Sequence, residues 1–190
     1  MSTTYIYIEP SKPLNKCTLD KTLKMLKIEG FDLIQDGNIF ILSLYNGEES
    51  LIKVQSSFLA LSDDLGVCLK GLVTPCLHSC FAEYVNSVPD NQVIYAFELG
   101  FTDKNIYRYC LDILKDFDSE TLITIKAYIE YGNSPTLSSQ RIFVHRNTVT
   151  YRINQFSSKT GIDLSFFPNC VFLLELIRKR HAEYPEEYFR

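Results

Sequence analysis

The sequence has no apolar run that approaches the ~18 to 20 residues needed to cross a bilayer. Its first residues, MSTTYIYIEPSKP, contain neither the basic segment nor the long apolar segment of a secretory signal. The G-x-S-x-G motif, the P-loop and the dinucleotide-binding fingerprint are absent as well. We therefore expect a cytosolic, cytoplasmic protein that neither contacts a membrane nor catalyses a reaction, and that carries no cofactor.

The six cysteines are scattered through apolar surroundings. Their one cluster is CLHSC, from Cys76 to Cys80, which offers at most three metal ligands, and the remaining histidines are His145 and His181. A structural zinc site usually shows four ligands in recognisable pairs. Reduced cysteine behaves as a small hydrophobic residue. We expect Cys76 and Cys80 to pack in the core, and we expect no metal site.

Basic residues are unevenly distributed along a chain whose net charge is −4. Residues 1–102 hold seven lysines and no arginine against twelve acids, a net charge of −5. Residues 103–190 hold seven arginines and five lysines against eleven acids, a net charge of +1. No acid occurs in residues 131–162, where the basic residues are Arg141, Arg146, Arg152 and Lys159. Such a local basic face can follow the phosphates of a nucleic acid, and the alternative is a solvated surface that lacks acids by chance.

The pattern of residues 1–103 is typical of a mixed α and β fold. Residues 15–29 predict a helix that ends at Gly30, because three leucines recur there at a helical spacing. Asp36-Gly37-Asn38 lies between two apolar runs and predicts a β-hairpin. Further strands are expected in TTYIYIEP, LIKVQSSF and QVIYAFEL, and a helix broken near Pro75 is expected over residues 64–86. The sequence thus predicts an α+β class, with a small α+β domain and an antiparallel sheet over residues 1–103.

Residues 104–190 contain no good strand and show short helical patterns separated by turn signals. Ser119 is expected to cap a helix, and Ser134-Pro135 to start a short one. Gly161 is expected to end the following helix, and Asn169 to cap the last. The second domain is therefore predicted to be all-α, over residues 104–190.

The segment VHRNTVTYR, residues 144–152, opens the most informative of these helices. In a helix over residues 147–158, Val149, Ile153 and Phe156 project to one side. This division suits a helix that reads the major groove, because amides and hydroxyls can bond base edges while guanidiniums meet phosphates. The polar side chains of the opposite face come from Asn147, Thr150, Tyr151, Asn154 and Ser158.

A second short helix precedes this segment and carries the small residue Ser139 where two helices would cross. Only a few residues separate the two helices, which is the layout of a helix-turn-helix unit. Three residues allow a structural role as an alternative to a DNA contact. His145 could bond the start of the helix, Asn147 could cap it, and Arg152 could pair with an acid of a neighbouring helix.

Residues 111–181 resemble the C-terminal helix-turn-helix domain of the PucR and CdaR group of bacterial transcription regulators. The similarity lies in LKDFDSETLITIKAYIEYGN, RIFVHRNTVTYRINQFSSKTGIDL and FLLELIRKR, and the block FVHRNTVTYRI is long and uncommon. Two departures from the family pattern are Ser139 in place of alanine and PTLSSQ in place of acids or alanines. The resemblance implies DNA binding through the helix after His145, with the contacting positions Arg146, Asn147, Thr148, Tyr151 and Arg152.

Residues 61–101 are similar in layout to a degenerate cyclase-like (GGDEF-like) domain that often precedes this module in CdaR-type regulators. The resemblance rests on a helix in SCFAEYVNSV that is followed by a short strand. The metal-binding signature of working cyclases is absent from the sequence, so the resemblance implies a regulatory domain and not an enzyme.

These observations predict a transcription regulator that binds double-stranded DNA as a homodimer, with a recognition helix over residues 146–158 in the major groove. The first alternative is a protein-interaction module whose helix pair no longer binds DNA. The second is a sensor for a small-molecule effector in the first domain. The residues expected at the DNA are His145, Arg146, Asn147, Thr148, Thr150, Tyr151, Arg152, Asn154 and Lys159.

Overall fold

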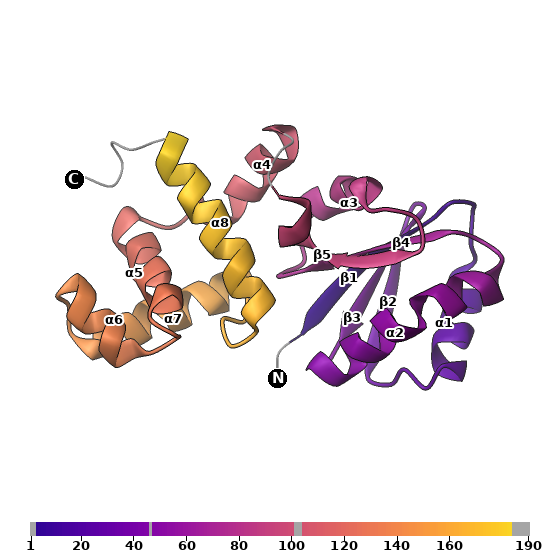
Figure 1. Cartoon of the computed structure of the whole chain (residues 1–190), viewed down its shortest axis with the longest axis horizontal. Helices are drawn as coiled ribbons and strands as arrows, with labels where there is room; N and C mark the ends of the chain where they lie inside the picture. The colour runs from indigo at the N-terminus through magenta and orange to yellow at the C-terminus, as the bar shows by residue number, and fades with distance from the viewer. Residues whose placement is uncertain (1–2, 46, 101–103, 184–190) are drawn as a thin grey trace. The chain divides into compact units, whose positions relative to one another are not determined.

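The computed structural model describes residues 3–45, 47–100 and 104–183. The chain divides into two compact units, Met1–Leu99 (unit 1) and Gly100–Arg190 (unit 2) (Figure 1). The predicted domain boundary after residue 103 falls at residues 101–103, which lie outside the described residues, and it stays a prediction. Within the described ranges, no helix combines the length and the apolar character needed to cross a membrane.

Unit 1 is built around a five-stranded sheet with the order β2-β3-β1-β4-β5. Its first four strands pair antiparallel in a β-α-β-β-α-β succession, which is the ferredoxin-like arrangement. The last strand pairs with β4 in parallel, so the α+β class is confirmed but the sheet is mixed. In chain order the elements are β1 (Thr4–Pro10), α1 (Lys16–Met25), β2 (Phe31–Asp36), β3 (Ile39–Leu44), α2 (Gly47–Leu65), β4 (Leu69–Thr74), α3 (Cys80–Tyr84), η1 (Val85–Ser87), β5 (Gln92–Tyr95) and η2 (Ala96–Leu99).

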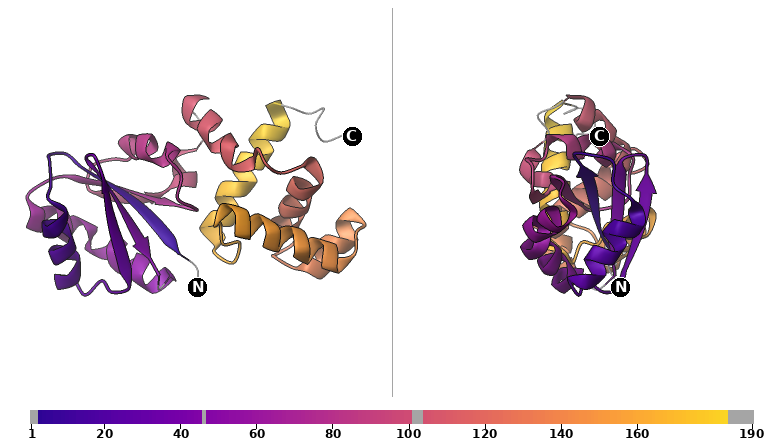
Figure 2. Two further views of the ribbon diagram at one scale, coloured as in Figure 1. Left: turned by 180° about the vertical axis from the view of Figure 1, so that it is seen from behind. Right: turned by 90° about the vertical axis from the view of Figure 1, so that its right-hand side faces the viewer.

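Helices α1 and α2 cover the same face of this sheet (Figure 2). Close packing of α2 depends on Gly71 of β4, which pairs with Ile8 of β1. A Cβ atom at Gly71 would lie 2.8 Å from Cγ2 of Val93 and 3.0 Å from the ring of Phe58. Since real Cβ atoms do not approach that closely, the position needs glycine for the helix to reach the sheet.

In unit 1, one predicted strand is a helix and one predicted helix contains a strand. The stretch LIKVQSSF, predicted as a strand, lies in α2, where Leu51, Val54 and Phe58 are buried at a helical spacing. The predicted helix over residues 64–86 is wrong before its expected break near Pro75, where β4 lies, and is confirmed after it by α3. Strand β4 pairs on both sides and is buried on both faces, so its sequence lacks the alternation that separates a strand from a helix.

In unit 1, the predicted β-hairpin turn is confirmed, and the predicted end of the first helix is wrong. The predicted hairpin is present, with Asp36 paired to Ile39 across the turn. The predicted helix over residues 15–29 ends early, at Met25, because Lys27 adopts a left-handed backbone with φ of 58°. The backbone N–H of Ile28 then donates to the carbonyl of Leu23 at 3.1 Å, which closes α1 before Gly30 is reached.

The clustered cysteines lie in the core of unit 1, as predicted. Cys76 and Cys80 are both buried, and burial raises the pKa of the Cys76 thiol to about 12. Beside them, the hydroxyl of Tyr7 donates to the carbonyl of His78 at 2.9 Å. A protonated, buried thiol is a poor nucleophile, so Cys76 has a packing role.

Unit 2 is all-α over its described residues, as predicted. Its core is formed by apolar side chains of four helices, among them Leu122, Ile125, Phe156, Phe172 and Leu173, all at most 1% exposed. The elements are α4 (Lys104–Leu111), η3 (Asp112–Leu114), α5 (Ser119–Glu130), α6 (Pro135–Ile142), α7 (Arg146–Thr160) and α8 (Phe167–Glu183).

The helix ends of unit 2 agree with the sequence at two positions and differ at two others. Ser134 caps α6, and Gly161 ends α7 with φ of 74°. The cap of α5 is Asp118 and not Ser119, which is the first helical residue. Asn169 lies within α8, where its side-chain amide donates to the Asp163 carbonyl at 2.9 Å and ties the preceding loop to the helix.

Candidate nucleic-acid interface

Helices α6 and α7 are joined by a short turn whose geometry follows from three residues. α6 ends at Ile142, and Phe143 takes a left-handed conformation with φ of 56° and ψ of 41°. The backbone N–H of Val144 donates to the carbonyl of Ser139 at 3.1 Å, which satisfies an end group of α6. His145 returns to an extended conformation and starts α7. The turn thus changes the chain direction within three residues.

Small residues let α6 pack closely against α5. Ser139 is buried, as the prediction of a small residue at the crossing required. Ser138 is buried more completely, and its hydroxyl lies 2.6 Å from the Ser134 carbonyl and 3.4 Å from the Ala127 carbonyl of α5. Sequence reasoning missed Ser138, because two adjacent serines do not show which of them faces the neighbouring helix.

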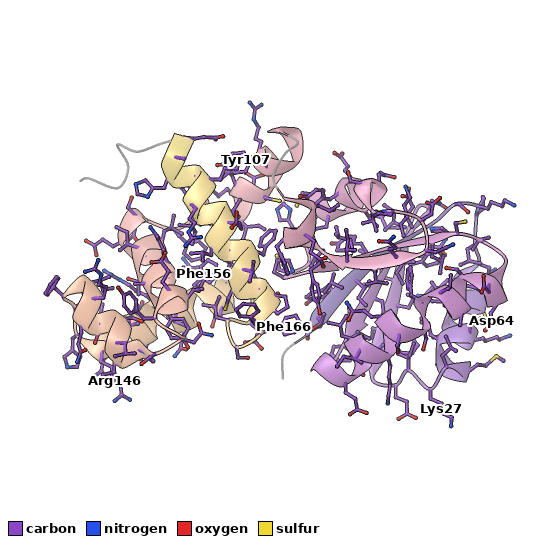
Figure 3. The ribbon with its side chains drawn as sticks, viewed as in Figure 1. Lys27, Asp64, Tyr107, Arg146, Phe156 and Phe166 are labelled. Carbon is purple, nitrogen blue, oxygen red and sulfur yellow. The ribbon has the colours of Figure 1, made fainter. Side chains whose placement is uncertain are left out.

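The inner face of α7 holds the helix on unit 2. Val149 and Phe156 are fully buried and Ile153 nearly so, as the helical spacing predicted. The ring of Phe156 lies 4.8 Å from that of Phe117, measured between centroids. Figure 3 shows Phe156 directed into the unit and Arg146 at its surface. Burial of this apolar stripe fixes which side of α7 faces solvent.

The outer face of α7 is open to solvent in unit 2. Tyr151 is 65% exposed. The hydroxyl of Thr150 donates to the Arg146 carbonyl at 3.2 Å, which leaves its oxygen able to accept another hydrogen bond. Amides, hydroxyls and a phenol therefore line one accessible surface, from the exposed residues Asn147, Thr150, Tyr151, Asn154 and Ser158.

His145 makes the structural contact that was the alternative to a phosphate contact. Its Nδ1 atom accepts a hydrogen bond from the backbone N–H of Asn147 at 3.1 Å, so His145 is the N-cap of α7. Asn147 lies inside the first turn, so the alternative that it caps the helix is wrong. Its side chain is exposed and has no hydrogen-bond partner among the described residues.

Arg152 likewise makes the structural contact named as its alternative. Its side chain is 18% exposed and pairs with the carboxylate of Glu120 on α5. One guanidinium nitrogen also donates to the Thr124 hydroxyl at 3.0 Å. Lys159, at the other end of α7, places its ammonium 5.5 Å from the centroid of the Phe117 ring. Both cations therefore hold α7 against its neighbours.

Two other basic side chains of α6 and α7 have no partner among the described residues. Within the described ranges, the side chains of Arg141 and Arg146 take part in no ion pair or hydrogen bond, and both are exposed. Neither α6 nor α7 contains an acid. The N-terminus of α7 adds the positive end of the helix dipole beside Arg146. The start of α7 is thus the most favourable place on this helix for an anion.

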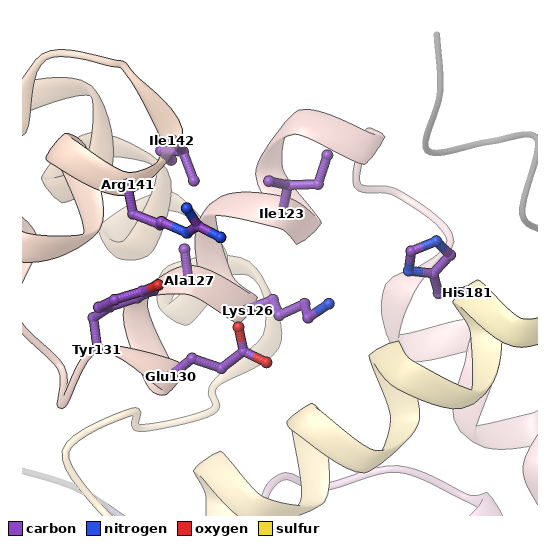
Figure 4. Close-up of a pocket in the computed structure, with 8 residues that line it drawn as sticks. All are labelled: Ile123, Lys126, Ala127, Glu130, Tyr131, Arg141, Ile142 and His181. Carbon is purple, nitrogen blue, oxygen red and sulfur yellow. The ribbon is translucent and has the colours of Figure 1, made fainter.

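A groove of about 370 Å³ lies beside the helix pair, between α5, α6 and α8 (Figure 4). Ile123, Ala127 and Ile142 form its apolar part, and its lining includes no residue of α7. Lys126 and Arg141 bring two cations to it. Its acid, Glu130, lies 3.3 Å from the guanidinium of Arg178. The groove is therefore separate from the polar face of α7.

The cap of α5 supplies a prediction about pH. The hydroxyl and then the backbone N–H of Thr121 hold the pKa of the Asp118 carboxyl below its ordinary value. A lowered folded-state pKa stabilises the fold above the unfolded pKa of about 4, and this stabilisation is lost as the pH falls through the folded value. Asp118→Ala should cost about 1 kcal/mol at pH 7, and urea titrations should show the difference shrinking below roughly pH 4.

Asp116→Ala is the matched control for this measurement. Asp116 is exposed two residues earlier and makes no hydrogen bond or ion pair within the described ranges. Its removal should leave the free energy of unfolding nearly unchanged. A loss from Asp118→Ala that is independent of pH would contradict the role of its ionised carboxylate.

A short helix, a turn with one left-handed residue and a longer helix with a polar exposed face define a helix-turn-helix unit. Comparison with protein families gives the same result: residues 121–176 match the PucR C-terminal helix-turn-helix domain. Residues 121–176 are therefore identified as a PucR-type helix-turn-helix domain, which confirms the resemblance for this part of the chain.

Proteins of two bacteria are similar to parts of this chain. The uncharacterized protein YxkF of Bacillus subtilis (strain 168) is 32% identical over 80 residues, 40% of this chain and 27% of that protein. The carbohydrate diacid regulator of Escherichia coli (strain K12) is 37% identical over 62 residues, 32% of this chain and 16% of that protein. The proline-responsive transcriptional activator PutR of Bacillus subtilis (strain 168) is 36% identical over 66 residues, 33% of this chain and 16% of that protein. The similarity thus spans about a quarter or less of each relative.

Proposed function

We propose that this protein is a sequence-specific, DNA-binding transcription regulator of the cytoplasm that inserts α7 into the major groove. The observation that carries the proposal is the outer face of α7, which is polar, free of acids and exposed, while its inner face is fixed in the core. One similar protein is a carbohydrate diacid regulator and another is a proline-responsive transcriptional activator, and the family that matches residues 121–176 is a helix-turn-helix family.

Specific roles follow from the free side chains of α7. Arg146 contacts a phosphate at the start of the helix. Asn154 and Asn147 have amides without partners among the described residues, and an amide of this kind can bond adenine through N6 and N7. Thr150 accepts a hydrogen bond from a base amino group. Thr148 and Tyr151 make supporting contacts, whereas Arg152, Lys159 and His145 position the helix.

The protein acts as a homodimer in this proposal. One reading helix contacts only a few base pairs, and two copies related by two-fold symmetry place their helices about 34 Å apart, in successive major grooves. A site with two inverted half-sites is therefore expected. Analytical ultracentrifugation with and without duplex gives the number of copies that are bound.

Selection of bound duplexes from a random pool tests the assignment of base contacts. Asn154→Ala and Thr150→Ala should each relax the base preference at one position of each half-site, by about 1 to 3 kcal/mol of discrimination. Glu175→Ala, at an exposed position of α8, is the control and should leave the selected sequence unchanged. If both α7 variants select the same sequence as the wild type, the assignment fails.

Recognition of another protein is a second candidate function, and the groove between α5, α6 and α8 is the observation that favours it. Its apolar residues and the two cations Lys126 and Arg141 suit a partner that is both apolar and acidic. Such a contact buries apolar area and uses only two cations, so it depends on salt less steeply than DNA binding through several phosphates. DNA binding depends strongly on salt, which separates the two functions in a single titration.

A further inference from the structure

Phe143 is the most exposed large hydrophobic residue of the described chain. Its side chain is 92% exposed, and its backbone is left-handed with φ of 56°. Residues with a Cβ atom avoid this conformation, and glycine adopts it freely. The other non-glycine residues of the described chain with positive φ are Lys27, Asn91 and Asn133, and two of these are the asparagine that tolerates it best.

Neither folding nor solubility accounts for phenylalanine at this position. The exposed ring buries almost no apolar area, so it contributes little to the core of unit 2. Glycine would complete the same turn without a Cβ atom in the left-handed region. Strained residues of this kind cluster at active sites and ligand contacts, where the surrounding structure holds them in place.

The surroundings of Phe143 indicate what contacts its ring. Two residues before it stands Arg141 and three residues after it stands Arg146, both exposed and both without an ion-pair partner among the described residues. No acid occurs within residues 131–162. The partner is therefore a polyanion that also offers an apolar group. In duplex DNA the apolar group of the major groove is the methyl group of thymine.

We propose that the ring of Phe143 packs against a thymine methyl group at the edge of each half-site. This inference rests on the proposed DNA binding, because the turn that carries Phe143 leads directly into α7. Arg141 and Arg146 then meet the phosphates on either side. The turn then takes part in base recognition together with α7. The contact of the aromatic ring also explains why residue 143 is phenylalanine and not glycine.

Replacing thymine by deoxyuridine tests the contact, because it removes the methyl group and nothing else. In the selected duplex, one thymine per half-site should be sensitive, and its replacement should weaken wild-type binding about 4-fold, as expected for one methyl-sized group at ~0.8 kcal/mol. Phe143→Gly should bind the unmodified duplex roughly 10-fold more weakly. In that variant the same thymine replacement should have no further effect.

Melting experiments keep this result separate from misfolding. Phe143→Gly should melt at the wild-type temperature or a few degrees above it, since it relieves a left-handed Cβ. The control is Phe167→Ala, which removes a ring that is 73% exposed at the start of α8, and it should leave both affinity and thymine sensitivity unchanged.

The outcomes distinguish this inference from the proposed function. If the wild type selects no duplex, DNA binding itself is overturned. If the wild type binds and Phe143→Gly binds equally well, the Phe143 contact is overturned while DNA binding stands. If Phe143→Gly weakens binding but no thymine is sensitive in the wild type, the ring contacts another group and the thymine assignment is overturned.

Discussion

Phe156→Ala should destabilise unit 2 by about 3 to 5 kcal/mol, the range for truncating a buried aromatic ring. Phe156 is fully buried, and its ring packs against that of Phe117. A domain of this size has a free energy of unfolding of roughly 5 to 15 kcal/mol, so the loss removes a large part of it. Urea unfolding followed by circular dichroism measures the change, and hydrogen exchange in residues 119–183 assigns it to this unit.

Ser158→Ala is the matched control on the same helix. Ser158 lies two residues further along α7, on its exposed side, so its removal should change the free energy of unfolding by less than about 0.5 kcal/mol. A loss below about 1 kcal/mol from Phe156→Ala would show that this ring does not anchor α7. The exposed face of the helix would then not be fixed by its packing.

Affinity for the selected duplex should fall about 10³-fold between 50 and 200 mM salt. The reason is the release of counterions: if two copies together neutralise about six phosphates, the slope of log affinity against log salt is about −5. Arg146→Ala should make the slope less steep by about 1 per copy, because one phosphate contact is lost. Fluorescence anisotropy with a labelled duplex measures both values.

Arg178→Ala is the charge-matched control for this titration. Arg178 lies on α8 and pairs with Glu130, so its removal should leave the salt slope unchanged. A duplex affinity that hardly changes with salt would contradict the proposed phosphate contacts, whereas no duplex binding at 50 mM salt would contradict DNA binding and favour a protein partner in the groove of Lys126 and Arg141. A slope equally reduced by both variants would show that Arg146 has no special contact.

The site was predictable where its geometry is local. Val149, Ile153 and Phe156 recur at the period of a helix, and this period alone separates an inner from an outer face of α7. The turn signals at Ser134 and Gly161 likewise act within a few residues of themselves. Helix ends are less certain by one residue, as Asp118 and Ser119 illustrate, because adjacent polar side chains compete for the same backbone groups.

The sequence alone did not show whether a basic residue of α7 binds a neighbouring helix or remains available for DNA. Arg152 pairs with Glu120, which lies 32 residues earlier in the sequence, and several other acids of the chain could have been its partner. The choice depends on how α5 and α7 cross. Phe143 was missed for a related reason: exposure of a phenylalanine is visible only once the neighbouring helices are placed, although its position in a turn where glycine is common was a usable signal.

Periodicity and turn residues indicated an α+β unit followed by a helical one with two neighbouring short helices, and the resemblance of residues 111–181 to the PucR and CdaR group identified these two helices as a helix-turn-helix motif. These properties are encoded over short distances, where each residue interacts with its near neighbours. Strand β4, the long helix α2 and the pairing of Arg152 came from long-range packing instead. A buried strand and a buried helix share the same apolar composition, and only the partners that the fold brings to them distinguish the two.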